Sequence, residues 1–419
     1  MNYFIIGNGP TGVIAAETLR KADPAGNITM IGSEAEPPYS RMAIPYLLMG
    51  NINEQGTHLR KGNDHFAHMK INNVVGKVSR VDTGAKKITL ESGAQHSYDK
   101  LLIASGSHPV APPISGIDLP GIHPCWTLDD ARKIMTIAKP GARVLQMGAG
   151  FIGCIIMESL AARGVKLTVV EMGDRMVPRM MTEGAGKMIK QWCEKKGVAV
   201  HTGAKVNSIE KGADGALVAN LSTGDKIAAD LIISATGVKP NIGFLQGTEV
   251  KTAAGVLVNN SMQTNVADIY AAGDVAEAKD FSTDKTLVNA IQPNAADQAR
   301  IAALNMAGKP TTSQGSLAIN VLDTLGLISS SFGRWWGADG GQSVELKDND
   351  NFKYMHLEFK DDVLVGATSV GLTQHVGVLR GLIQSQTKLG PWKDTLLKDP
   401  TRVMEAYLAQ AQAQSTAKL

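Results

Sequence analysis

Gly7-Asn8-Gly9-Pro10-Thr11-Gly12 is the stretch that decides the fold of this chain. It follows the apolar run Tyr3-Phe4-Ile5-Ile6 and precedes a helical pattern from Val13 to Ala22, so it predicts a tight turn between a buried strand and a helix. In such a turn the first glycine permits the reversal, the second leaves room above the backbone, and the third allows close packing of helix on strand. Glu34 follows the next apolar strand, Ile28 to Ile31.

The same pattern occurs a second time. Gly148-Ala149-Gly150-Phe151-Ile152-Gly153 follows the apolar strand Arg143 to Met147 and opens a helix to about Arg163, and Glu171 ends the strand Lys166 to Val170. A single glycine-rich turn can be purely structural, but two in matched context predict two dinucleotide sites, with pyrophosphate at each helix N-terminus and ribose hydroxyls on each glutamate. A carboxylate repels a ribose 2′-phosphate, so Glu171 favours NAD over NADP.

Length and composition agree with this interpretation. The 419 residues, 43% of them hydrophobic, are enough for two or three cores. The net charge is only +3 and no basic run alternates with aromatics, so nucleic-acid binding is not expected. No apolar stretch is long enough to span a membrane, and Met1 to Ile6 is the first strand rather than a leader, so a cytoplasmic location is expected.

The cysteines and histidines give no sign of a second redox or metal centre. Cys125, Cys154 and Cys193 are far apart in sequence, and we expect each to be a small buried residue rather than part of a cluster or an active disulfide. The nine histidines are scattered without ligand spacing, so no metal site is expected.

The order of patterns predicts an α/β fold with two Rossmann-like dinucleotide-binding domains and a C-terminal α+β interface domain. Residues 1–111 and 240–311 are expected to form the first domain, which residues 112–239 interrupt as the second. A hairpin is predicted from Val74 to Val81 and Lys87 to Leu90. Two buried strands end in similar small residues, Ala104-Ser105-Gly106 and Ala235-Thr236-Gly237.

Residues 312–419 have no phosphate loop, so we expect a packing or interface module. Trp335-Trp336 and the helix Val403 to Ala413 are candidates for partner contact, with ordinary packing as the alternative. The predicted strands and helices of this module are Lys353 to Lys360, Val363 to Val370, Thr373 to Ser385 and Pro400 to Ala413.

These motifs, followed by Ile269-Tyr270-Ala271-Ala272-Gly273-Asp274-Val275, resemble those of the FAD-dependent pyridine nucleotide oxidoreductases. Within that family the chain is most similar to rubredoxin reductases, the flavoprotein part of NADH-dependent nitrite reductases and NAD-linked flavin subunits of larger complexes. The resemblance implies an FAD site at Gly7, Gly9, Pro10, Thr11, Gly12, Glu34, Arg41, Ala104, Ser105, Gly106, Gly273, Asp274, Asn294 and Ala295, and an NAD(H) site at Gly148, Gly150, Phe151, Ile152, Gly153, Glu171 and Gly237.

Two of these assignments have alternatives when each residue is considered alone. Asp274 could equally cap a helix, and Arg41 could be an ordinary surface arginine. Asn289 to Ala296 begins a helix, whose N-terminal amides would stabilise negative charge on a reduced flavin if they point at it.

The chain also departs from the family pattern. Tyr46 and Ile155 stand where relatives often carry a lysine and a glutamate beside the flavin, and we expect the joint loss of this ion pair to lower the flavin potential. Peroxidase and water-forming oxidase relatives need a redox cysteine where this chain has Met42, and usually a histidine where it has Pro10. No paired cysteines follow Tyr39, so disulfide reduction is not expected.

The resemblance implies hydride transfer between NADH and flavin N5 with no catalytic protein acid or base. Electrons would then pass one at a time to or from a protein electron carrier or an iron–sulfur partner subunit. The chain would be a homodimer or a subunit of a larger complex. Two alternatives remain: an NADH-sensing flavoprotein with little turnover, like apoptosis-inducing factor, and an NADH oxidase.

Overall fold

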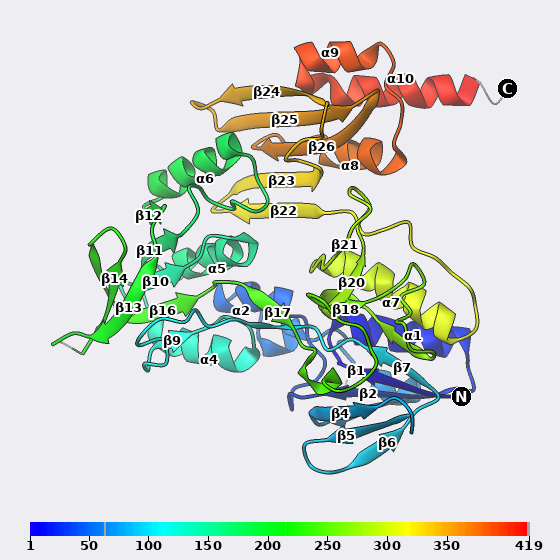
Figure 1. The fold of residues 1–419 in the computed structure, drawn as a ribbon. Coiled ribbons are helices and arrows are strands. Elements are labelled where there is room, and N and C mark those ends of the chain that lie inside the picture. The colour runs from blue at the N-terminus through cyan, green and yellow to red at the C-terminus, as the bar shows by residue number, and fades with distance from the viewer. Residues whose placement is uncertain (63, 214, 417–419) are drawn as a thin grey trace. The chain divides into compact units, whose positions relative to one another are not determined.

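The computed structural model describes residues 1–62, 64–213 and 215–416, which divide into two compact units (Figure 1). Unit 1 comprises residues 1–47, 52–108 and 238–317, and unit 2 comprises the remaining described residues. Unit 1 thus contains most of the two segments expected for the first dinucleotide domain. Unit 2 brings together the segments expected for the second domain and for the C-terminal module, and the exact domain boundaries stay predictions.

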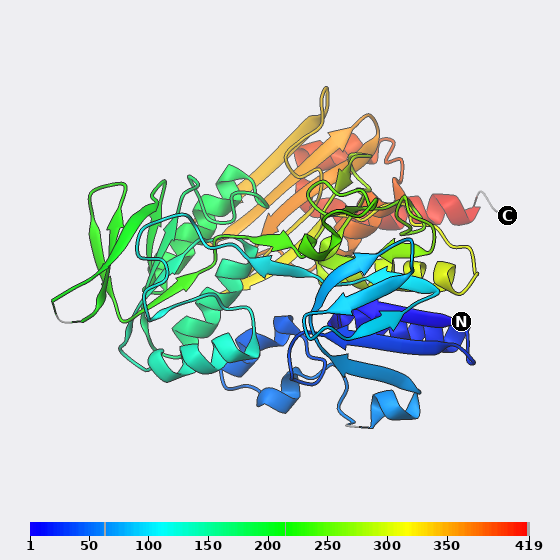
Figure 2. The same cartoon turned by 60° about the horizontal axis from the view of Figure 1, so that its bottom comes forward.

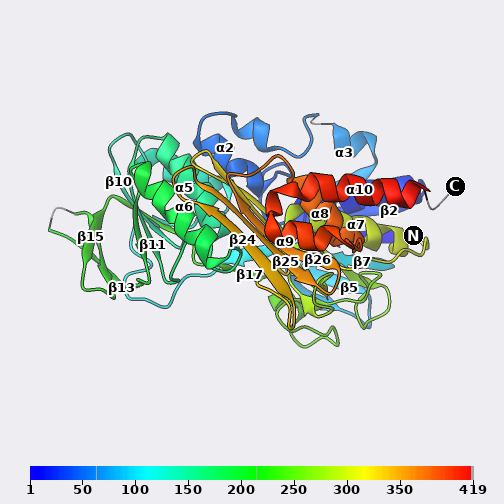
Figure 3. The same ribbon diagram turned by 90° about the horizontal axis from the view of Figure 1, so that it is seen from above.

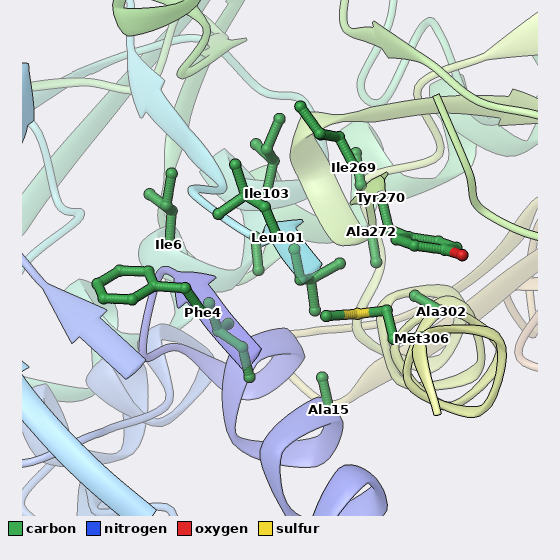
Figure 4. Close-up of a cluster of buried hydrophobic side chains, with 14 of the residues drawn as sticks. Phe4, Ile6, Ala15, Leu101, Ile103, Ile269, Tyr270, Ala272, Ala302 and Met306 are labelled. Carbon is green, nitrogen blue, oxygen red and sulfur yellow. The ribbon is translucent and has the colours of Figure 1, made fainter. Parts of the chain in front are cut away.

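The centre of unit 1 is a parallel five-stranded sheet of order β19-β7-β1-β2-β3. Helices α1 and α7 pack against each other, and Figure 4 shows Ala15, Ala302 and Met306 from these helices beside Phe4 and Leu101 of the sheet. The bounds of these elements are β1 Asn2–Ile6, α1 Pro10–Ala22, β2 Asn27–Gly32, β3 Ile71–Val75, β7 Lys100–Ile103, β19 Ile269–Ala271 and α7 Gln292–Met306.

A small antiparallel sheet of order β4-β5-β6 contains the predicted hairpin, with one correction. The expected continuous strand from Val74 to Val81 is wrong, because the chain breaks at Gly76 and the two halves belong to different sheets. A Cβ at Gly76 would lie 3.0 Å from the side chain of Leu90. The remaining elements of this part of the chain are η1 Arg41–Ala43, α2 Ile44–Leu48, η2 Glu54–Thr57, α3 His65–His68, β4 Val78–Asp82, β5 Lys87–Leu90, β6 Gln95–Ser97, β8 Ser107–Pro109, β17 Val238–Pro240, η3 Gly243–Leu245, β18 Val256–Leu257, η4 Gly273–Val275, β20 Ala276–Lys279 and β21 Thr286–Leu287.

Unit 2 contains a second parallel sheet, of order β12-β11-β10-β16-β9, and a small antiparallel sheet beside it that Figure 2 shows in green. Helix α4 begins with a capping box in which Thr127 and Asp130 satisfy each other's backbone N–H groups. The elements are β9 Ile122–His123, α4 Leu128–Ile137, β10 Arg143–Met147, α5 Phe151–Ala162, β11 Lys166–Glu171, α6 Glu183–Lys195, β12 Ala199–Thr202, β13 Val206–Lys211, β14 Leu217–Leu221, β15 Lys226–Ala229 and β16 Leu231–Ser234.

The C-terminal part of unit 2 is an antiparallel sheet of order β22-β23-β26-β25-β24, with helices α8, α9 and α10 on one face (Figure 3). Helices α5 and α6 contact β22 and β26 of the same sheet. The elements are β22 Ile319–Thr324, β23 Leu327–Gly333, β24 Gln342–Asp348, β25 Lys353–Lys360, β26 Val363–Val370, α8 Val376–Ser385, α9 Trp392–Lys398, η5 Pro400–Arg402 and α10 Val403–Thr416.

The C-terminal predictions are confirmed in part. The two predicted strands have the predicted bounds, while α8 begins at Val376 rather than Thr373, and the last helix opens with a 3₁₀ turn at Pro400. Trp336 is exposed, whereas Trp335 is only 9% exposed, so Trp335 follows the alternative of ordinary packing, and partner contact by Trp336 stays a prediction. Two parallel sheets with helices, together with a separate antiparallel sheet, confirm the α/β class.

Candidate functional site

The glycine-rich turn of unit 1 joins β1 to α1 as predicted. Gly7 adopts a φ of +116°, and a Cβ on Gly7 or on Gly12 would overlap a backbone carbonyl oxygen, so packing alone demands glycine at both positions. Gly9 differs, because apart from its chain neighbours no atom of the described residues lies within 4 Å of the point where its Cβ would be. That open point beside the N-terminus of α1 is where a phosphate can approach the backbone.

The turn contacts a second predicted element, the segment around Gly273. Gly273 has a φ of +80°, and a Cβ there would overlap the hydroxyl of Thr11, so the two segments touch. The N–H of Gly273 donates to Oε1 of the buried Gln298 at 2.8 Å, and Nε2 of Gln298 donates to the hydroxyl of Ser316 at 3.0 Å. Gln298 therefore fixes the backbone that presents Asp274.

Asp274 is half-buried, and a hydroxyl holds its carboxylate. The hydroxyl of Ser107 donates to its carboxylate at 2.9 Å. Burial raises the pKa of Asp274 above its ordinary value, while the hydrogen bond from Ser107 and the charge of Arg41 oppose that rise. A half-buried carboxylate oriented in this way is an acceptor for hydroxyl groups of a ligand.

Glu34 lies two residues beyond the end of β2, and two side chains orient it. The hydroxyl of Tyr39 donates to one carboxylate oxygen at 2.6 Å, and the guanidinium of Arg41 donates to the other at 2.8 Å. Arg41 is thus close to both acidic groups of the predicted FAD site.

The segment Ala104 to Gly106 follows β7, and two hydrogen bonds join it to Asn241. The hydroxyl of Ser105 donates to the carbonyl of Asn241, and the side-chain amide of Asn241 donates back to the carbonyl of Ser105, both at 2.8 Å. These two hydrogen bonds fix the backbone just before Ser107, whose hydroxyl donates to Asp274. Sequence reasoning gave no role to Asn241, and its position after Pro240 was the only signal.

The helix N-terminus predicted near the flavin is that of α7, and two of its residues make hydrogen bonds within the protein. Asn294 is buried and its side-chain amide donates to the carbonyl of Leu317 at 3.2 Å. The N–H of Ala295 donates to the carbonyl of Ile291 at 3.0 Å, as the first helical hydrogen bond. A ligand at this end would therefore meet the dipole of α7 and the amides before Ala295.

In the second glycine-rich turn, which lies in unit 2, the first and last glycines are again crowded and the middle glycine is again in open space. Gly148 has a φ of +99°, and a Cβ there would overlap the carbonyl of Ala235, while a Cβ on Gly153 would lie 2.5 Å from the carbonyl oxygen of Gly148. Among the described residues nothing approaches the Cβ point of Gly150 within 4 Å. Here too the middle glycine has no packing reason.

Glu171 ends β11 and reaches back to this turn. Its carboxylate accepts a hydrogen bond from the N–H of Ala149 and another from the N–H of Gly173, both at 2.7 Å. The backbone thus fixes the carboxylate beside the phosphate loop, where the adenosine ribose of a dinucleotide is bound in this kind of fold. At this position its negative charge would repel a 2′-phosphate on that ribose.

The remaining predicted residues of unit 2 border the same end of the sheet. Phe151 and Ile152 are partly exposed in the first turn of α5, whose amides point toward the turn. Gly237 follows β16 with a φ of +121°, and its carbonyl accepts from the N–H of Val110 at 2.9 Å.

Both turns fit a dinucleotide by their own geometry. Each combines an unexplained middle glycine, a helix N-terminus and a glutamate after the next strand. Gly9 and Gly150 have nearly identical backbone angles, with φ of −73° and −74°, so the two cradles are alike. Pyrophosphate is the group that this combination binds.

The cysteines of the chain do not form a reactive site. All three cysteines are buried, and burial raises the pKa of Cys125 and of Cys193 to about 12, so neither is a thiolate at neutral pH. The described residues contain no group of three or more acidic, histidine or cysteine side chains that could hold a metal. Nor do they contain a helix with the length and apolar character needed to cross a membrane. Tyr46 is exposed and Ile155 is half-buried, and their effect on a flavin stays a prediction.

The chain is similar to known proteins over most of its length. The family model described as pyridine nucleotide-disulphide oxidoreductase matches residues 1–302. The chain is 32% identical over 412 residues, 97% of either chain, to the epsilon subunit of NADH-dependent phenylglyoxylate dehydrogenase of Aromatoleum evansii. It is 26% identical to rubredoxin-NAD(+) reductase of Pseudomonas putida, covering 92% of this chain and 99% of that protein.

Solved structures show the same fold. A covalent putidaredoxin reductase–putidaredoxin complex aligns with a TM-score of 0.90 at 22% identity, over 98% of this chain and 99% of the other. NADH:rubredoxin oxidoreductase of Clostridium acetobutylicum aligns with a TM-score of 0.80 at 25% identity, over 95% and 99%.

The family match and the full-length relative together confirm the expected Rossmann-like architecture, the cofactors FAD and NAD(H), and an oxidoreductase activity. The chain belongs to the pyridine nucleotide-disulphide oxidoreductase family.

Proposed function

We propose that this protein moves electrons between NADH and a protein electron carrier or an iron–sulfur partner subunit by way of FAD. The observation that carries this proposal is the pair Gly9 and Gly150, each the only glycine of its turn without an internal packing reason. A residue that the fold does not require, repeated at both helix N-termini, points to two ligands that approach the backbone there.

For the FAD site we assign a role to each group of residues in unit 1. The turn and the N-terminus of α1 would take the pyrophosphate, Glu34 the adenosine ribose and Asp274 the ribityl chain. When bound, FAD accepts a hydride and releases electrons singly. The proposed set is Gly7, Gly9, Pro10, Thr11, Gly12, Glu34, Arg41, Ala104, Ser105, Gly106, Gly273, Asp274, Asn294 and Ala295.

For the NAD(H) site the corresponding residues come from unit 2. The turn and α5 would bind the pyrophosphate, and Glu171 would bind the ribose and select NAD(H) over NADP(H). No protein acid or base is needed, because these residues only align and hold the dinucleotide. The proposed set is Gly148, Gly150, Phe151, Ile152, Gly153, Glu171 and Gly237.

A protein acceptor is supported by what the similar proteins are named for. One is a subunit of a larger NADH-dependent dehydrogenase, and another is a rubredoxin reductase. We therefore propose that this chain acts with a carrier or as one subunit of a complex, in the cytoplasm. We also propose the domain division 1–111 with 240–311 for FAD, 112–239 for NAD(H) and 312–419 for an interface.

Alanine at the two middle glycines separates ligand binding from folding. Gly9→Ala should release FAD while the unfolding midpoint of the apoprotein stays within about 2 °C of the wild type, since an alanine has space and an ordinary φ there. Gly150→Ala should retain FAD and lose NADH binding. Gly243→Ala and Gly381→Ala, also in open space but outside both turns, are the controls. Full FAD content in Gly9→Ala would count against the assignment.

Stopped-flow absorbance then tests turnover. NADH should bleach the oxidised flavin within seconds, and an added iron–sulfur or rubredoxin-type carrier should restore its colour faster than oxygen does. Reoxidation by oxygen at the same rate would indicate an NADH oxidase. A persistent charge-transfer band without turnover would indicate a sensor. Purification from the native source would show which proteins accompany the chain.

A further inference from the structure

The two glycine-rich turns differ in one buried residue. Ile5 and Gln146 occupy equivalent places, each two residues before the first glycine of its turn, and both are fully buried. A Cβ on Gly12 would lie 3.4 Å from the side chain of Ile5, and a Cβ on Gly153 would lie 3.1 Å from Nε2 of Gln146. Each side chain therefore lies directly beneath the last glycine of its turn.

Gln146 makes hydrogen bonds that an isoleucine cannot make. Its Nε2 donates to the carbonyl oxygen of Gly148 and to that of Gly153, both at 2.9 Å. Because both acceptors are carbonyls, the amide nitrogen must face them, which fixes the orientation of the side chain. One side chain thus ties the first glycine of the second turn to its last.

Stability alone gives a poor account of this glutamine. Oε1 of Gln146 is buried, and within the described residues it has no hydrogen-bond partner, which is unfavourable. The equivalent Ile5 satisfies the same packing without any polar atom to desolvate. A buried amide that lowers stability, among the apolar residues Val144, Leu145 and Met147, indicates that Gln146 serves a purpose other than stability. Its only side-chain hydrogen bonds in the described structure go to the turn, so that purpose concerns the turn.

We propose that Gln146 is a positioning residue for the dinucleotide pyrophosphate, which it serves by holding the Gly148–Gly153 backbone in its binding shape before the ligand arrives. The inference rests on the proposed NAD(H) role of this turn. A turn that is ordered in advance loses less conformational freedom on binding, so its affinity is higher. The first turn, built on Ile5, lacks this device.

Gln146→Met is the test, because methionine has a similar size and no N–H. We expect the dissociation constant for NADH, measured by calorimetry, to rise about tenfold, as the loss of one to two buried hydrogen bonds would give. FAD content should not change, and the unfolding midpoint should stay within about 3 °C of the wild type. Gln146→Glu should bind NADH still more weakly, since it sets a carboxylate against two carbonyl oxygens. Leu145→Met, on the opposite face of β10, is the matched control and should change nothing.

Hydrogen exchange of the peptide covering residues 147–154, in protein without nucleotide, tests whether the hydrogen bonds of Gln146 order the turn. Exchange should be faster in Gln146→Met and unchanged in Leu145→Met. Unchanged exchange, or an unchanged NADH affinity, would overturn the role of Gln146 and leave the proposed function intact. If NADH instead fails to protect this peptide in the wild type, the assignment of the turn to NAD(H) is wrong, and the inference falls with it.

Discussion

The hydroxyl of Thr182 lies 2.6 Å from the hydroxyl of Tyr354, and this contact joins helix α6 to the C-terminal sheet within unit 2. The Tyr354 hydroxyl also donates to the carboxylate of Glu345 at 2.8 Å, and the tyrosine ring is fully buried against Gly184. Burial raises the pKa of Tyr354 well above its ordinary value, so the group is a neutral donor at every physiological pH. The C-terminal sheet is thereby fixed to the part of the chain that carries the second turn.

Tyr354→Phe should test this joint. The substitution keeps the ring and removes the hydroxyl, which leaves Thr182 and Glu345 without their shared partner. We expect the free energy of unfolding to fall by about 1–2 kcal/mol in a urea titration. Tyr407→Phe, at an exposed position on α10, should change it by less than about 0.5 kcal/mol. Equal losses of stability in both variants would show that the hydrogen bonds of the Tyr354 hydroxyl do not stabilise the contact between α6 and the C-terminal sheet.

Gly12→Ala should damage folding rather than binding. A Cβ at this position would overlap the carbonyl oxygen of Gly7, which is backbone and cannot move aside cheaply. We expect a loss of soluble protein, or a free energy of unfolding lower by about 3 kcal/mol, as overpacking of a close helix–strand contact gives. The contrast with Gly9→Ala, which should fold and fail only to hold FAD, separates the two uses of glycine. A stable, colourless Gly12→Ala variant would refute this separation.

Local patterns predicted both turns from sequence, since glycine spacing and the change from apolar strand to helix are visible within about 30 residues. Contacts between distant segments were not visible in this way. Gln298, which orients Gly273, reads as an ordinary polar residue of α7 until the fold brings the two together. Gln146 carried a weak signal, as the single amide in the strand Val144 to Met147, but its acceptors lie on a turn whose shape the sequence does not give.

The differences between the predicted and the observed structure also have specific physical causes. Val74 to Val81 has continuous strand character, and only the packing around Gly76 divides it between two sheets. Trp335 and Trp336 are indistinguishable in the sequence, yet in the turn that follows β23 Trp335 is buried and Trp336 is exposed.

Glu171→Gln should weaken the preference for NADH. The variant keeps the size of the side chain and removes the negative charge, so a 2′-phosphate is no longer repelled. We expect the ratio of kcat/KM for NADH to that for NADPH to fall about tenfold or more, which corresponds to about 1.4 kcal/mol. Glu34→Gln, the equivalent change in unit 1, should loosen FAD and leave this ratio unaltered. An unchanged ratio in Glu171→Gln would show that other groups select the nucleotide.

Glu17 predicts a pH dependence of stability in unit 1. Its carboxylate accepts two hydrogen bonds from the guanidinium of Arg60, both at 2.6 Å, and lies 2.8 Å from Nε2 of His65. Burial alone would raise the pKa of Glu17, but the hydrogen bonds from Arg60 and His65 outweigh it, so the pKa lies below its ordinary value in the folded protein.

The sign of the effect follows from this shift. The unfolded chain binds a proton at Glu17 near pH 4.5, whereas the folded protein binds it only at lower pH, so the stabilisation is complete above about pH 4.5 and is lost as the pH falls through the folded pKa. Glu17→Gln should therefore lower the free energy of unfolding by about 2 kcal/mol at pH 7 and by progressively less below pH 4.5.

Glu183→Gln is the matched control, because Glu183 pairs with Lys187 on the exposed surface of α6, where solvent screens the interaction. Urea titrations between pH 3 and pH 7 should show a pH-dependent gap between wild type and Glu17→Gln and a much smaller one for Glu183→Gln, because solvent screens the exposed pair with Lys187 that lowers the pKa of Glu183. A constant gap for Glu17→Gln would mean that the carboxylate contributes by packing rather than by its charge.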